Sequence, residues 1–111
     1  MNKAVERLFK RSKVVSARTL AKIIHRSKLR WGVGQLANSD GGYCALGILA
    51  MEAGVDRETL HHSPQGPAGL MGIFETNDRL TSKEDVVQAL CAMGDRKFPV
   101  GHWVDELKRG E

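Results

Sequence analysis

A cysteine behind a glycine-rich turn is the residue of this sequence best placed for covalent chemistry. Cys44 lies in the segment Gly41-Gly42-Tyr43-Cys44-Ala45-Leu46-Gly47, at or near the expected start of an apolar helix. The unpaired N–H groups and the positive end of the dipole at a helix start favour the thiolate over the thiol. This pattern is therefore typical of a position that suits a nucleophile.

A cysteine nucleophile also needs a base and a group that orients the base. The candidate bases are His61, His62 and His102, and the candidate orienting groups are Asn77 and Asp78. The other interpretation is that the cysteine is a small buried residue of a central helix, a common position for a cysteine outside a disulfide. We favour this second interpretation and assign no catalytic residue. A cysteine-dependent hydrolase or transferase is kept as the alternative.

Asn77 and Asp78 also have an interpretation that needs no ligand. Side chains of Asn and Asp bond to their own nearby backbone and stabilise the turn that leads into a helix. A helix is expected to begin a few residues after this pair. We therefore favour the turn role over the orienting role.

The spacing of metal-ligating and glycine residues argues against a metal or cofactor site. The available ligands lack the short-spaced pairs of structural zinc sites; they are Cys44, His61, His62, Cys91 and His102. Gly32-Val33-Gly34 lacks the third glycine and the strand-to-helix context of a dinucleotide site. We expect no bound metal and no cofactor.

Positive charge is concentrated at the N-terminal end of the chain. Residues 1–30 hold ten Lys or Arg residues against the single acid Glu6, a net charge of +9, whereas the remainder carries −5. Such asymmetry indicates either an acidic partner or packing of the basic segment against the protein's own acidic half. The sequence leaves both explanations open.

Three cations recur every four residues within this basic segment. Arg18, Lys22 and Arg26 alternate with Leu20 and Ile24 at helical spacing, so they form a positive stripe on the solvent side of an amphipathic helix. Together with Arg11, these residues are the predicted partner-binding set. The stripe would fit an acidic protein surface or, without sequence specificity, the phosphates of nucleic acid. A simply solvated face needs no partner at all.

The remaining pattern predicts a mainly α protein, a compact single-domain bundle of four to five short helices. Helical periodicity or capping marks residues 2–13, 16–26, 44–53, 56–61, 82–93 and 103–107, the first two as two helices or one bent helix. Thr81 or Ser82 is expected to cap the fifth segment. A turn-rich stretch is compatible with a small β-hairpin near residues 35–45, and the Pro- and Gly-rich residues 63–69 predict a loop. Residues 1–30 are expected to pack on a core formed by residues 31–109.

Length, apolar pattern and cysteine usage bear on where the protein works. The longest apolar run, Cys44 to Ala53, is broken by Gly47 and Glu52 and is too short to span a bilayer. The amphipathic N-terminus does not resemble a secretory signal. Two distant cysteines suit reduced thiols better than a disulfide framework. We expect a cytoplasmic protein without a membrane partner.

The order of several motifs resembles a family of small proteins from actinobacteria and phages, a domain of unknown function. The motifs are Leu20-x-x-x-Ile24, Trp31-x-x-Gly34-x-Leu36-Ala37, Tyr43-Cys44-Ala45-Leu46-Gly47 and Phe74-x-x-Asn77-Asp78. In that family a Trp-x-x-Gly element precedes a Cys-Ala-x-Gly helix, and an Asn-Asp pair precedes the last long helix. The likeness spans residues 18–93. This sequence departs from it in the spacing between Phe74 and Asn77 and in its basic arm. The resemblance implies a compact helical domain of phage or mobile-element origin.

These observations predict a small non-enzymatic interaction protein. By analogy with other small phage proteins, it is expected to be a phage-encoded inhibitor of a host nucleic-acid-handling or defence complex, similar in kind to an anti-CRISPR protein. Its expected partner is an acidic or nucleic-acid-binding protein of the host cytoplasm, bound through Arg11, Arg18, Lys22 and Arg26. A non-specific nucleic-acid-binding protein is the remaining alternative.

Overall fold

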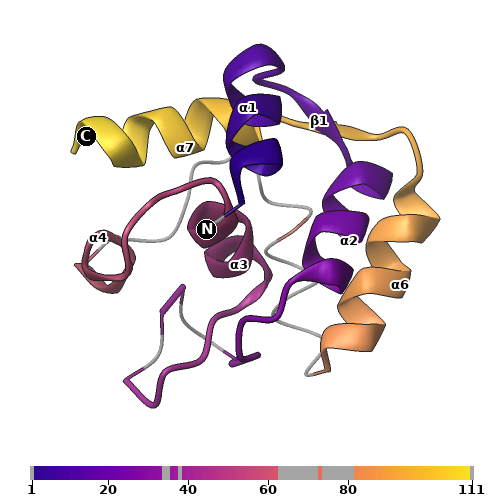
Figure 1. The fold of residues 1–111 in the computed structure, drawn as a ribbon. Helices are drawn as coiled ribbons and strands as arrows, with labels where there is room; N and C mark the ends of the chain where they lie inside the picture. The colour runs from indigo at the N-terminus through magenta and orange to yellow at the C-terminus, as the bar shows by residue number, and fades with distance from the viewer. Residues whose placement is uncertain (1, 34–35, 38, 63–72, 74–81, 111) are drawn as a thin grey trace.

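Six helices and one short antiparallel sheet make up the part of the chain that the structure describes. This structure is a computed structural model, and it describes residues 2–33, 36–37, 39–62, 73 and 82–110. Five of the six helices have at least seven residues (Figure 1). The helices are α1 (Lys3–Arg11), α2 (Ala17–Arg26), α3 (Ala45–Glu52), α4 (Arg57–His62), α6 (Lys83–Met93) and α7 (Val100–Arg109). The predicted mainly helical class is confirmed.

The basic N-terminal segment forms two separate helices, α1 and α2, each begun by a polar cap. The Asn2 side chain accepts hydrogen bonds from the backbone N–H groups of Ala4 and Val5, and Ser16 Oγ accepts one from Thr19 N. Such caps satisfy N–H groups that have no partner within the helix. The strand β1 (Val15–Ser16) interrupts the helical path between the two helices. Two helices, rather than one bent helix, are therefore formed.

The antiparallel sheet joins distant parts of the chain. β1 pairs with β2 (Lys97–Phe98), with Val15 opposite Phe98. The prediction of a hairpin near residues 35–45 is corrected, because the described residues of that stretch contain no strand. Tyr43 instead makes an isolated parallel bridge to Trp31, in which Tyr43 N donates to the Arg30 carbonyl oxygen at 2.9 Å. The glycine turn thus places Tyr43 beside Trp31, not opposite the residues directly before the turn.

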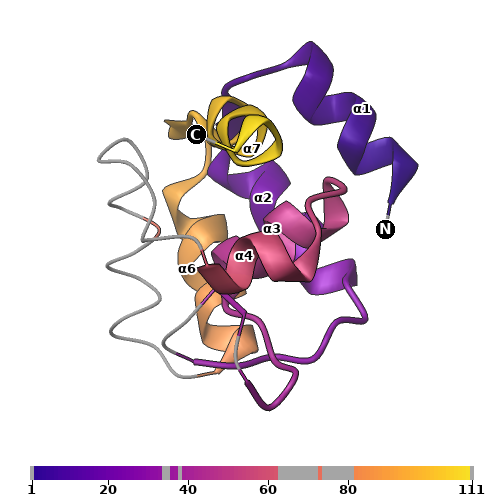
Figure 2. The ribbon, with the colours of Figure 1, turned by 90° about the vertical axis from the view of Figure 1, so that its left-hand side faces the viewer.

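The apolar helix α3 lies at the centre of the molecule, as predicted for residues 44–53. Cys44 is its N-cap, and the helix is buried along nearly its whole length. A helix that is apolar on all sides needs neighbours on all sides. Figure 1 shows α2 beside α3, with α6 on the far side of α2, and Figure 2 shows α7 above α3. Gly54, with φ of +96°, ends this segment in a conformation that favours glycine.

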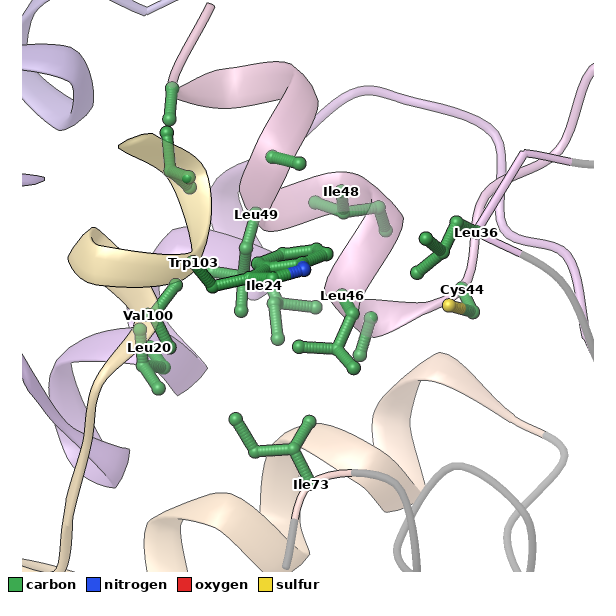
Figure 3. Close-up of a cluster of buried hydrophobic side chains, with 14 of the residues drawn as sticks. Leu20, Ile24, Leu36, Cys44, Leu46, Ile48, Leu49, Ile73, Val100 and Trp103 are labelled. Carbon is green, nitrogen blue, oxygen red and sulfur yellow. The ribbon is translucent and has the colours of Figure 1, made fainter. Parts of the chain in front are cut away.

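Side chains from α2, α3 and α7 meet in one hydrophobic core (Figure 3). Leu20 and Ile24 come from α2, Leu46 and Leu49 from α3, and Trp103 from α7. All five are at most 3% exposed. The helix that carries the basic stripe therefore also supplies central core residues on its other side.

The C-terminal helices begin close to the predicted positions. Ser82 is the cap of α6, and its Oγ accepts a hydrogen bond from Asp85 N at 3.1 Å. Gly94, with φ of +57°, ends α6 as expected. α7 begins directly after Pro99, earlier than the predicted residues 103–107. The predicted loop at residues 63–69 lies outside the described residues.

Two ion pairs and one backbone contact hold the N-terminal segment to α7. Lys13 pairs with Asp105, and Lys108 Nζ lies 3.6 Å from Glu6 Oε1. The hydrogen bond from Lys13 holds the pKa of Asp105 below its usual value, because it stabilises the carboxylate. Gly101 N also donates to the Lys13 carbonyl oxygen at 2.9 Å. The first and last helices of the chain, α1 and α7, are therefore neighbours in the fold.

Candidate functional site

The predicted positive stripe on α2 is exposed. Arg18, Lys22 and Arg26 all face solvent, whereas Leu20 and Ile24 on the other side of the helix are fully buried. This division follows from the period of an α-helix, because residues four apart lie on one face. The exposure of the stripe was correctly predicted.

The first cation of the stripe has a partner within the protein. Arg18 Nη1 lies 2.9 Å from Asp95 Oδ1, and the Arg18 backbone N–H donates to the Gly94 carbonyl oxygen at 3.1 Å. Asp95 follows α6 and belongs to the acidic part of the sequence. The pair is solvent-exposed, so its contribution to stability is small. It nevertheless lowers the net positive charge at this end of the stripe.

Internal packing accounts for part of the charge asymmetry seen in the sequence. Lys13 and Arg18 pair with acids of the C-terminal half. Among the described residues, no carboxylate forms an ion pair with Arg11, Lys22 or Arg26. Part of the basic segment is thus neutralised internally, and part faces solvent.

Lys22 and Arg26 border a groove between α1 and α2. The groove has a volume of about 260 Å³, and its apolar lining includes Ala4, Leu8 and Ile23. Leu8 and Ile23 are only partly buried, although they pack against the hydrophobic core. The structure thus places two cations beside apolar surface that is accessible to a partner.

The groove separates the four predicted binding residues into two groups. Lys22 and Arg26 line it, whereas Arg18 is paired with Asp95 and Arg11 is exposed at the last turn of α1. The sequence analysis did not assign Ala4, Leu8 or Ile23 to a binding face, although all three line the groove. A usable signal was present, because Leu8 and Ile23 extend the apolar stripes of their helices beyond the residues needed for burial.

Cys44 occupies the helix-start position expected for a nucleophile, but it is buried. It is the N-cap of α3, its side chain makes no capping hydrogen bond, and it is 6% exposed. Figure 3 shows it at the start of α3, close to Leu36. Neither Cys44 nor Cys91, both in the described part of the chain, forms a disulfide.

The candidate partners of Cys44 are distributed over several elements. His61 lies on α4 and His102 on α7, and both are exposed. His62 ends α4, and Asn77 and Asp78 lie outside the described residues. Among the described residues, Cys44, His61 and His102 thus lie on three different elements.

The two thiols are expected to react at very different rates. Cys91 is exposed on α6, so iodoacetamide should modify it in the folded protein. Modification of buried Cys44 requires local opening, and an opening that costs about 3 kcal/mol slows labelling about a hundredfold. The rates can be measured by intact-mass spectrometry, with the Cys91→Ser variant isolating Cys44. Equally fast labelling of Cys44 in folded Cys91→Ser protein would instead favour the cysteine-dependent alternative.

The described residues form neither a metal-ligand cluster nor a membrane-spanning helix. Within them, no three His, Cys, Asp or Glu side chains come together as a metal ion would require. None of the described helices is both long enough and apolar enough to cross a membrane.

The described structure covers only part of the motif pattern that resembles the actinobacterial and phage family. Part of its pattern, including Gly34, Phe74 and the Asn77-Asp78 pair, lies outside the described residues. The family assignment stays a prediction. Comparison of the chain with protein-family models, with curated proteins and with solved structures finds no match in any of the three.

Proposed function

We propose that this chain is a small non-enzymatic interaction protein that binds an acidic surface of a protein partner through the groove between α1 and α2. The observation that carries the proposal is the position of Lys22 and Arg26 beside a partly apolar groove. Protein interfaces typically combine an apolar centre with charged residues at the rim, and the rim charges guide association. A merely solvated helix face needs no apolar surface next to its charges.

The form of this function that we favour is inhibition of a host complex that handles nucleic acid or defends against phage, similar in kind to an anti-CRISPR protein. The motif resemblance described above supports a phage origin. Nucleic-acid-binding clefts are themselves basic, so a basic inhibitor would dock on an acidic surface of such a complex and not in the cleft itself. The partner is therefore expected to be an acidic protein or an acidic part of one.

Reversal of the two groove cations is expected to abolish partner capture. Tagged wild-type protein and the double variant Lys22→Glu/Arg26→Glu would be compared in pull-downs from nuclease-treated lysate, with mass spectrometry of the bound proteins. We expect at least about tenfold less partner on the variant, because two negative charges at the rim of the interface would repel an acidic partner. Far-UV circular dichroism would verify that both proteins are folded.

The matched control reverses two exposed cations away from the groove, Lys10 and Lys97. The double variant Lys10→Glu/Lys97→Glu changes the net charge by the same amount and is expected to keep the partner. Equal loss in both variants would mean that total charge matters and not this face. Retention of the partner by Lys22→Glu/Arg26→Glu would contradict the proposal. Material captured only without nuclease treatment would identify nucleic acid as the bound molecule.

Arg18 is expected to contribute less than Lys22 and Arg26. A partner that engages Arg18 must first compete with Asp95, which already accepts a hydrogen bond from it. The interaction gained is then offset by the interaction lost. This asymmetry within one stripe could not be derived from helical spacing alone.

A further inference from the structure

The groove between α1 and α2 leaves apolar surface that the fold itself does not cover. Leu8 and Ile23 are partly buried and Ala4 is exposed, and they line the same depression as Lys22 and Arg26. The depression is smaller than the ~300–1,000 Å³ of pockets that enclose small-molecule ligands. Its volume of about 260 Å³ suits one or two apolar side chains of a protein partner better.

The two cations specify the charge pattern of the occupant. Lys22 and Arg26 lie four residues apart on α2, which is about 6 Å along the helix axis. Carboxylates at positions i and i+4 of a partner helix have a similar separation. Glu52 is the acid that lines the groove, and its Oε1 accepts a hydrogen bond from Ser27 Oγ at 3.2 Å. Ser27 thus holds the groove's acid at the end of α2.

We infer that this groove binds an amphipathic helical segment of the partner, with a bulky apolar side chain in the groove and two carboxylates on Lys22 and Arg26. The inference rests on the proposed function and gives the chemistry of the segment that is bound. Helix-in-groove recognition works in this way, since apolar anchors supply the buried contact and flanking charges select the partner. A phosphate backbone would satisfy the cations but would leave the apolar lining unused.

Three synthetic peptides test the two parts of this recognition separately. The first is a helix of about 15 residues, long enough to be helical in part, with Leu on one face and Glu at i and i+4 beside it. The second replaces each Leu by Ala, and the third replaces each Glu by Lys. We expect saturable binding of the first peptide, with amide NMR shift changes confined to α1 and α2. The other two should bind at least about tenfold more weakly.

A variant that fills the groove without changing charge tests the site itself. Ala4→Leu adds an apolar side chain at an exposed lining position, and Leu is nearly as good a helix former as Ala. We expect it to weaken binding of the first peptide about tenfold by occupying the space of the partner's side chain. The matched control is Ala92→Leu, the same exchange at an exposed position of α6, which should bind as the wild type does.

The outcomes separate this inference from the proposed function. Equal binding of the Leu and Ala peptides, no binding of the Leu peptide, or an Ala4→Leu variant with unchanged affinity would each overturn the inference. An RNA oligonucleotide that binds the same face more tightly, and is insensitive to Ala4→Leu, would overturn it in favour of phosphate recognition. If the captured partner is lost on Lys22→Glu/Arg26→Glu but not on Ala4→Leu, the proposed function stands and the helix-in-groove inference fails.

Discussion

Replacement of Trp103 by Ala is expected to lower the free energy of unfolding by about 3–5 kcal/mol, the usual cost of truncating a large buried aromatic residue. The indole is 3% exposed and lies in the core among side chains from α2, α3 and α7 (Figure 3). Its removal leaves a cavity bordered by three helices, which cannot all close on it together. Because domains of this kind are stable by only about 5–15 kcal/mol, the variant should lose a large part of its stability.

Urea unfolding followed by far-UV circular dichroism would measure this loss. Trp103→Phe keeps an aromatic ring and should lose less than Trp103→Ala. The neighbouring exchange His102→Ala lies on the exposed side of α7 and should change stability by no more than about 0.5 kcal/mol. A loss below about 1 kcal/mol for Trp103→Ala would show that the indole is not a central core residue.

Gly47→Ala is expected to destabilise the protein, although the same exchange within a helix normally stabilises it by about 0.5–1 kcal/mol. A Cβ atom at Gly47 would overlap the carbonyl oxygen of Leu36 and lie 2.8 Å from its carbonyl carbon. The obstacle is backbone, not the end of a flexible side chain, so the segment at Leu36 must move away from α3. We expect a net loss of about 3 kcal/mol, at the upper end of the cost of overpacking a core.

The sign of the change distinguishes the tertiary effect from helix propensity. Thermal and urea unfolding of Gly47→Ala should both show a less stable protein. Ala92→Gly, at an exposed position of α6, calibrates propensity alone and should cost about 1 kcal/mol. A Gly47→Ala variant that is more stable than the wild type would mean that the Leu36 segment does not lie against α3.

Much of the helical structure could be predicted because its signals are local. The cap at Ser82 and the glycine at Gly94 bound α6, and the apolar run after Cys44 defines α3. The hairpin near residues 35–45 was wrongly predicted for the converse reason. The turn itself is formed, since Gly42 N donates to Asp40 Oδ1 at 3.1 Å. A turn does not determine, however, which segment the residues on either side of it pair with. Tyr43 pairs with Trp31, and Val15 with Phe98 at the other end of the chain.

For the candidate binding face, the sequence by itself determined the concentration of positive charge and the exposure of Arg18, Lys22 and Arg26. Both follow from composition and from the period of one helix. Only the tertiary structure decided that Arg18 meets Asp95, that Gly47 meets Leu36, and that Lys22 and Arg26 border a groove with Leu8. Each of these contacts joins residues distant in sequence, and their partners are selected by how whole helices pack. Helical periodicity specifies which side of a helix is buried, but not which neighbour covers it.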